Sequence, residues 1–393
     1  MKDLMKESLV ATTMVLIITF CISFIPFKFE FAKPIRQGFL GFDIYDLYYS
    51  GKHLENSKRD SNIILVQVAD KRNAIADQIR IIEKYTPAVI GIDAVFKEQR
   101  DSLENIKLLH EISQYGNIIL ASELDMNSSL DQPAFTHNFF EDNDHHYHFG
   151  YTNIQGNQFA VARNYLPFLK AGDSIYPAFT SVIAERFAPE KFNELKRRNR
   201  KWEIINYTGN LENYTSLSKE ELLYSDGSNQ LRDILTGKIV LVGYFDKQVP
   251  LIMEDFHFSP LNEQVAGKSF PDMYGIVIHA NILSMILSGE YASETSEFVS
   301  YLLAGIITFL FLYSILLQHK KRKHPVHIWL LFQQFLIILL ILYLFLQVFD
   351  CFHVKVPLLP IMIALALCVE LLDIYKMIAV RLHKKYMYKT IFK

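Results

Sequence analysis

The chain has 393 residues, a formal net charge of −2 and an apolar share of 50%. This length allows one large domain or two smaller ones, and a nearly neutral chain gives no reason to expect a nucleic-acid partner. Three cysteines are too few for a framework of disulfide bonds. A folded domain in this chain must therefore be held together by its hydrophobic core.

The apolar residues concentrate in four stretches, which are 9–27, 298–318, 328–349 and 354–373. A hydrocarbon core about 30 Å thick needs roughly 20 apolar residues in a helix. The second and third stretches have this length and are uncharged, whereas the fourth contains Pro357, Pro360 and Glu370. We expect a transmembrane helix at each of the four.

The first stretch has an alternative interpretation, because an apolar run near the N-terminus can be a cleaved signal peptide. It is longer than the usual apolar core of about 7–15 residues, and no small-x-small cleavage site precedes Phe31. The sequence therefore predicts an uncleaved anchor at 9–27, with cleavage as the alternative.

Positive charge predicts the topology. Residues 319–327 and the tail 374–393 are rich in Lys and Arg, and such segments stay on the cytoplasmic side. The N-terminal residues 1–8 are then also cytoplasmic, and 28–297 form an extracytoplasmic domain.

Within this domain, apolar runs alternate with helical patterns. The runs 62–70, 88–96 and 117–123 are continuous, as in strands buried on both faces. Residues 73–85 and 102–116 between them have the apolar spacing of helices. This alternation predicts right-handed crossovers and an α/β fold with a mostly parallel sheet and flanking helices.

The later part of the domain continues the pattern. FGYTNI (149–154) and EIINYTG (203–209) predict strands, and YPAFTSVIAERF (176–187) predicts a helix. TGKIVLVGYFD (236–246) is expected to close the sheet. An amphipathic helix at 275–288 then leads, through about nine residues, to the second membrane helix.

Acidic side chains mark the ends of several expected strands. Asp70, Glu123 and Asp246 lie at or just past such ends, and Asp93 lies late in its strand. Ligands of open α/β sheets bind at the carboxyl ends of the strands, where converging acids could hold a cation or a cationic ligand. The alternative for Asp70 and Asp246 is a helix cap or a turn. An unpaired carboxylate inside the apolar run 88–96 would lower the stability of the fold. We therefore expect the side chain of Asp93 to have a partner.

Other motifs give little support for chemistry. EDNDHHYH (141–148) lacks the ligand spacing of a zinc site, so we expect a solvated loop and no metal. AGKSF (266–270) lacks the first glycine of a phosphate-binding loop and is followed by Pro271. KRRNRK (196–201) predicts a solvated surface turn, with anion or lipid binding as the alternative. No catalytic residue and no cofactor is predicted.

Several segments occur in an order that is similar to a known family. They are IILVQVAD, PAVIGIDAVF, FGYTNI, IYPAFTSVIAERF and INYTG, followed by TGKIVLVGYF, DFHFSPL and YGIVIHANILSMIL. This order resembles the type-2 CHASE sensor domain, an extracytoplasmic input module of bacterial histidine kinases and nucleotide cyclases, over roughly residues 35–318. The closing segments are the most specific, and they add Asp255, His279 and Asn281 to the candidate ligand-binding residues.

The chain departs from the family pattern in two places. The segment after Asp70 is short and lacks the Trp and Pro residues common in the family, which puts any ligand contact there in doubt. Family members also usually continue into an output domain, whereas this sequence ends about 20 residues after the last expected membrane helix. We therefore expect no output domain.

Three functional hypotheses follow. The first is a membrane-anchored sensor that binds an unknown extracytoplasmic ligand and relays a signal to a separate membrane or cytoplasmic protein, with a homodimer as one form that it could take. The second is an outer-face enzyme using Asp93, Asp255 and His279 as acid–base groups, which would satisfy only part of an active site. The third is a structural or assembly subunit, which predicts exposed apolar surface and no formed pocket. The sensor predicts a pocket at the strand ends.

Overall fold

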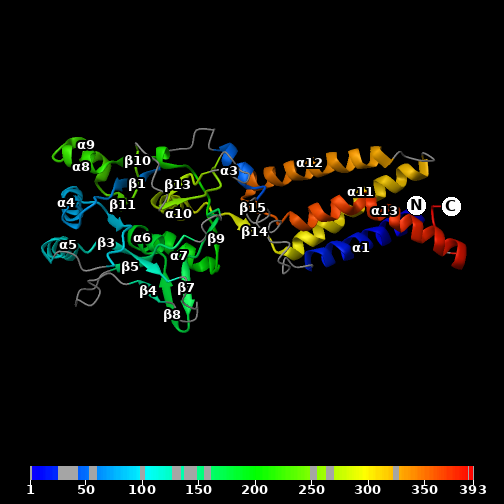
Figure 1. Ribbon diagram of the computed structural model, residues 1–393, viewed down its shortest axis with the longest axis horizontal. Coiled ribbons are helices and arrows are strands. Elements are labelled where there is room, and N and C mark those ends of the chain that lie inside the picture. The colour runs from blue at the N-terminus through cyan, green and yellow to red at the C-terminus, as the bar shows by residue number, and fades with distance from the viewer. Residues whose placement is uncertain are drawn as a thin grey trace. The chain divides into compact units, whose positions relative to one another are not determined.

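The computed structural model describes residues 2–24, 43–52, 60–97, 102–125, 134–136, 148–154, 161–247, 255–262, 270–321, 327–387 and 389–392. The chain divides into two compact units, both drawn in Figure 1. Residues 40–292 form one of them, called the α/β unit below. Residues 1–39 together with 293–393 form the other, called the helical unit.

The α/β unit is built on a sheet of seven described strands. Their order is β10 (Tyr214–Leu217), β1 (Asp60–Gln67), β11 (Ile239–Gly243), β2 (Val89–Ile92), β3 (Ile118–Leu124) and β4 (Phe135–Thr136), with β5 (His148–Tyr151) also paired to β3. Every pair is parallel except β3 with β4. The predicted mostly parallel sheet is confirmed.

Two expectations about this sheet are wrong. The strand expected to close it, β11, lies in its centre between β1 and β2, where both faces are covered and all five residues are buried. The strand expected at 203–209 is only β9 (Glu203–Ile204), which pairs with β6 (Asn164–Tyr165) outside the main sheet. The edge position belongs instead to β10, a partly polar strand that the apolar pattern did not predict.

Helices cover both faces of the sheet (Figure 1). One face packs against α4 (Arg72–Glu83), α5 (Ser102–Gln114), α8 (Lys219–Tyr224) and α9 (Asn229–Leu235) in one apolar core. The other face contacts α6 (Phe179–Phe187) and α10 (Gly275–Ser288), and α7 (Pro189–Arg198) packs beside them. The remaining short elements are α3 (Asp46–Lys52), β7 (Phe168–Ala171), β8 (Ser174–Pro177), η2 (Leu211–Asn213), β12 (Phe256–His257) and β13 (Met273–Tyr274).

The start of α6 lies so close to β5 that only glycine fits at Gly150. A Cβ atom added there would lie 2.5 Å from Cα and 2.6 Å from N of Phe179, so the helix backbone would have to move. Replacing Gly150 with alanine is therefore expected to lower the free energy of unfolding by about 1–3 kcal/mol. Thermal unfolding of the full-length protein in detergent measures this loss.

Gly116→Ala is the matched control, because a Cβ added at Gly116 meets no atom within 4 Å. This control should unfold at the wild-type temperature or slightly above it. Equal stability of the two variants would contradict the close approach of α6 to β5.

The helical unit contains α1 (Lys2–Phe24), α11 (Glu297–Lys321), α12 (His327–Phe352) and α13 (Leu359–Tyr386). Within the described residues, three helical segments are long and apolar enough to cross a membrane, and they lie at Asp3–Ile22, Glu297–Lys321 and His327–Phe352. These match three of the four expected membrane helices.

The fourth expected membrane helix lies in α13, which differs from the expectation at both ends. The helix begins at Leu359 and carries Glu370, Asp373 and Lys376 within its first five turns. It continues to Tyr386, so the first part of the expected basic tail is helical. The fourth span stays a prediction.

Polar side chains of α12 face its neighbours in the helical unit. The Gln334 amide donates to the Ala366 carbonyl at 3.0 Å and accepts from the Val369 N–H of α13 at 3.3 Å. Gln333 exchanges hydrogen bonds with Gln318 of α11. This arrangement is typical of polar groups in membrane helices, which find partners on adjacent helices.

A short pair of parallel strands completes the helical unit. In it, β14 (Ser293–Glu294) pairs with β15 (Val354–Lys355), so the residues just before α11 are bonded to the connection between α12 and α13.

Candidate functional site

Asp93 and His279 meet on the face of the sheet covered by α10. Asp93 directly follows β2, and His279 lies one turn into α10. The distance between His279 Nε2 and Asp93 Oδ2 is 3.9 Å, and the two side chains are only 6% and 15% exposed. His279 is thus the neighbour of Asp93 in this buried region, at a distance longer than a hydrogen bond.

Burial shifts the pKa values of these two groups in opposite directions. It raises the pKa of Asp93 to about 7, with a further contribution from the charge of Asp255. Burial also lowers the pKa of His279 to about 3, with a further contribution from His257. Desolvation penalises the charged form of each group. Between these two pKa values, both side chains are neutral in the folded protein.

Asp255 and His257 complete what we call the acid–base cluster, together with Asp93 and His279. The Asp255 carboxylate lies at the start of α10, with Oδ1 2.9 Å from where Gly275 would carry a Cβ. A helix N-terminus favours a negative charge, and glycine leaves room for it. His257 Nε2 lies 3.8 Å from Asp255 Oδ1. The cluster unites three of the seven predicted site residues.

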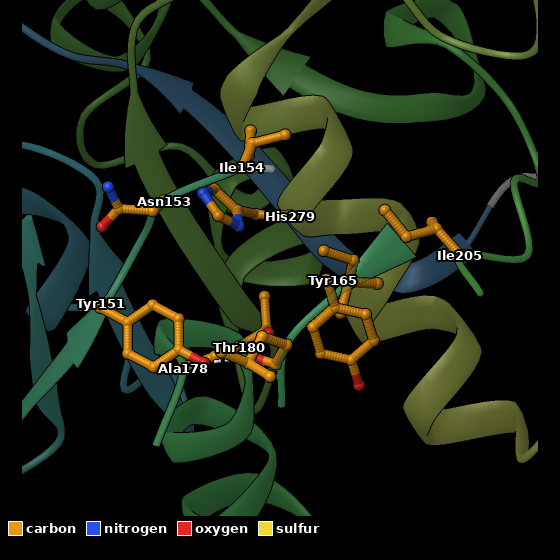
Figure 2. Close-up of a pocket in the computed structure, with 10 residues that line it drawn as sticks. Tyr151, Asn153, Ile154, Tyr165, Ala178, Thr180, Ile205 and His279 are labelled. Atoms are coloured by element: carbon orange, nitrogen blue, oxygen red, sulfur yellow. Dashed lines mark hydrogen bonds between the residues drawn. The ribbon is translucent and has the colours of Figure 1, made fainter. Parts of the chain in front are cut away.

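A small cavity adjoins His279 (Figure 2). Its wall includes Tyr151, Asn153, Thr180 and His279, and its volume is about 10 Å³. The buried Nδ1 atom of His279 makes no hydrogen bond to the part of the chain that is described. A cavity of this size holds about one water molecule. It does not accommodate an organic substrate, so it gives the enzyme hypothesis no support.

Asn281 holds the protein together rather than lining a cavity. Its side chain is buried, and Oδ1 accepts hydrogen bonds from the N–H groups of Thr208 and Gly209 at 2.8 and 3.2 Å. Nδ2 donates to the carbonyls of Gly209 and Val277, both at 2.9 Å. The amide thus ties α10 to the INYTG segment, and both of its N–H donors are used within the chain.

A larger pocket lies at the carboxyl ends of β1 and β2. This strand-end pocket has a volume of about 360 Å³, within the range of small-molecule sites. Its lining residues are Asp70, Arg72, Ile75, Ala94, Val95, Phe96 and Lys97. A pocket at the strand ends is what the sensor hypothesis predicts.

The remaining predicted acids do not join the acid–base cluster. Asp70 is 82% exposed and pairs with Lys219 of α8 at 2.7 Å; it does not cap α4, whose N-cap residue is Lys71. Glu123 pairs with Lys97. The backbone carbonyl of Asp246 accepts a hydrogen bond from the Tyr274 hydroxyl at 3.0 Å.

Sequence reasoning missed Arg72 and Lys97. Both follow the carboxyl ends of strands within five residues, at the same places where Asp70 and Asp93 were singled out. The signal for both is therefore present in the sequence, as basic residues that follow the same strand ends as the acids. The segment 141–147 of the predicted solvated loop lies outside the described residues.

The predicted surface turn KRRNRK is wrong for residues 196–198, which form the end of α7, and Arg198 is not merely solvated. Arg198 forms two hydrogen bonds with the buried carboxylate of Glu203, at 2.7 and 2.8 Å, and its guanidinium lies 4.1 Å from the ring centre of Tyr291. An arginine with a planar, bidentate partner and an aromatic face is structural.

A comparison with models of known protein families identifies a domain in this chain. The family model of the CHASE2 domain matches residues 56–317, which run from just before β1 into α11. No curated protein and no solved structure gives a significant match. The match covers well over half of the chain, and CHASE2 domains are sensory extracellular domains. The chain therefore belongs to the CHASE2 domain family.

Proposed function

We propose that this protein is a membrane-anchored sensor whose CHASE2 domain lies outside the cytoplasmic membrane of a bacterium and signals to a separate protein. The main support is the family match over residues 56–317, combined with a strand-end pocket of about 360 Å³. In this proposal the output activity belongs to that separate protein.

Helix α10 is the proposed carrier of the signal. It begins beside Asp255, carries His279 one turn later, and contacts β1 and β11 of the sheet. It ends at Gly289, whose φ of 75° suits a glycine C-cap. Residues 289–296 connect it to α11. The domain would have two conformations that differ in the position of α10. A ligand that binds one of them more tightly would raise its population.

The alternative of a structural or assembly subunit predicts no formed pocket. The strand-end pocket therefore favours the sensor. The outer-face enzyme does have its acid–base groups close together. However, the cavity beside His279 has room for about one water molecule.

Copurification tests the relay to a partner. The full-length protein would be extracted from its native membranes in mild detergent, with and without prior cross-linking, and the proteins that accompany it identified. The expected result is a stoichiometric partner that carries a kinase, cyclase, phosphatase or transport domain. An unrelated multi-pass protein purified in parallel is the control. Recovery of this chain alone, even after cross-linking, would remove the support for a relay in trans.

The proposed topology predicts the labelling of Cys351, whose side chain is exposed near the end of α12. With 28–297 and the connection after α12 outside, a membrane-impermeant maleimide should label Cys351 in intact cells of a C21S/C368S variant. The control carries C351S in addition, with Lys321→Cys on the cytoplasmic side, and should be labelled only after lysis. The reverse labelling pattern would invert the topology.

A further inference from the structure

The last part of α13 extends beyond the neighbouring helices of the helical unit. The ring of His319, in the last turn of α11, lies 6.1 Å from that of Phe392, and the Phe392 ring lies 6.3 Å from that of Tyr375 in α13. Tyr375 is therefore close to the level at which α11 ends. Residues 376–386 add about 16 Å of helix beyond this level. Figure 1 shows this part of α13 in red, and residues 374–387 are called the projecting end below.

Polar contacts mark where the predicted membrane region ends on this side. His327, the first residue of α12, has Nδ1 3.2 Å from Oδ2 of Asp373 and Nε2 3.8 Å from Oε1 of Glu370. Helix α11 ends with Lys320 and Lys321. Charged groups are costly in hydrocarbon, so these groups lie at the membrane surface. We therefore place the projecting end in water, on the side that positive charge predicts to be cytoplasmic.

Two adjoining rows of side chains run along the projecting end. The first row consists of exposed apolar residues four positions apart, which are Ile374, Ile378, Leu382 and Tyr386. The second row is also exposed, adjoins the first at a spacing of three residues, and consists of Met377, Arg381 and Lys385. An apolar row of this kind in water is typical of a surface that a partner covers.

The projecting end is positively charged, and the sequence around it does not offset this charge. Residues 374–393 contain six Lys or Arg and no acid, and the connection 322–326 is basic as well. The acids of α1 and α13 on this side are Asp3, Glu7, Glu370 and Asp373. Glu7 accepts a hydrogen bond from the Tyr375 hydroxyl, and the last two face His327. In the part of the chain that the structure describes, Arg381 and Lys385 form no ion pair.

Geometry and charge favour a separate protein as the occupant of this surface. Helices that bind a bilayer surface lie parallel to it, whereas the projecting end continues an uninterrupted helix that includes the fourth predicted span. A second copy of this chain would bring the same cations close to one another, which is unfavourable. An acidic partner with an apolar groove complements both rows.

We propose that the projecting end of α13 docks into an apolar groove with an acidic rim on a separate protein. Ile378 and Leu382 enter the groove, as the apolar face of an amphipathic helix does in such complexes, and Arg381 and Lys385 contact the acidic rim. This proposal rests on the proposed sensor function, because it names the surface through which the signal reaches the output protein.

Photo-crosslinking of the full-length protein in its native cells tests this surface. Leu382 is replaced by the photo-crosslinker p-benzoylphenylalanine, and the molecule attached to it after irradiation is identified by mass spectrometry. We expect a peptide of a separate protein in which apolar residues are flanked by Asp and Glu. Arg381→Glu/Lys385→Glu should lower the yield of this adduct by at least about tenfold, because it places like charges together at the rim.

Lys320→Glu/Lys321→Glu is the matched control. It reverses the same number of charges at the exposed end of α11, on the same side of the helical unit. The adduct yield should stay within about twofold of wild type, since these residues lie outside the docking surface. An equal loss in the two variants would reveal a general attraction of the whole basic side and would overturn the proposal.

The other outcomes separate the docking surface from the relay. Adducts with lipid alone, with a second copy of this chain, or with no molecule overturn the proposal. A partner that copurifies with Arg381→Glu/Lys385→Glu as well as with wild type overturns the docking surface and leaves the relay intact. If no partner copurifies with the wild-type protein, the relay itself fails, and the docking proposal fails with it.

Discussion

Replacing Asn281 with leucine is expected to lower the free energy of unfolding of the α/β unit by about 3–5 kcal/mol. The change removes the amide that joins α10 to the INYTG segment and leaves the N–H groups of Thr208 and Gly209, and the carbonyl of Gly209, without this partner. Each buried polar group left unsatisfied costs about 1–3 kcal/mol. Denaturant unfolding of the full-length protein, followed by circular dichroism, measures the loss.

Ser288→Ala is the control for this prediction. Ser288 lies at the exposed end of the same helix, and surface changes of this kind stay within about 0.5 kcal/mol. If Asn281→Leu is no less stable than Ser288→Ala, the hydrogen bonds of Asn281 do not hold α10 in place. Asn281 would then become available as a ligand-binding residue, as the sequence suggested.

The second large effect concerns pH and the buried pair of Asp93 and His279. The pKa of Asp93 is raised to about 7 in the folded state, so its contribution to stability is complete at low pH and is lost as the pH rises from about 4 to about 7. The pKa of His279 is lowered to about 3, so its contribution is complete above about pH 6.5 and is lost as the pH falls.

Between about pH 4.5 and 6.5 the two contributions change in opposite directions and nearly cancel. Removing one group should make the pH-dependent contribution of the other group measurable. Relative to wild type, Asp93→Asn should gain about 1.4 kcal/mol of stability for each unit that the pH rises, and His279→Gln should lose about the same. Denaturant unfolding of the full-length protein at several pH values in this window gives the slopes.

The double variant Asp93→Asn/His279→Gln is the control, because it should show the same pH dependence as wild type. Slopes close to zero in both single variants would contradict the raised pKa of Asp93 and the lowered pKa of His279.

Much of the fold could be predicted because its signals are local. Strands such as β1 and β2 are continuous apolar runs, and α4 places Ile75, Ile79 and Ile82 at helical spacing, all of them buried. The order of strands is not local. The central place of β11 depends on which apolar run finds two neighbours, and the edge strand β10 has a pattern too mixed to predict.

The candidate site was predictable in part, for a similar reason. The sequence marks Asp93 because a carboxylate inside an apolar run is costly, yet only the fold shows that His279, far along the chain, lies beside it. Likewise, Lys97 pairs with Glu123 and Lys219 pairs with Asp70 at the strand-end pocket. Such pairings join residues from different elements, so the sequence alone does not reveal them.

The pairing of β14 with β15 has a mechanical consequence. The N–H of Ser293 donates to the His353 carbonyl at 2.8 Å, and that of Thr295 donates to the Lys355 carbonyl at 2.9 Å. Within the helical unit, these hydrogen bonds hold the segment before α11 against the connection between α12 and α13. A force applied at Ser293 would therefore act on this connection as well as on α11, so that three helices would share it.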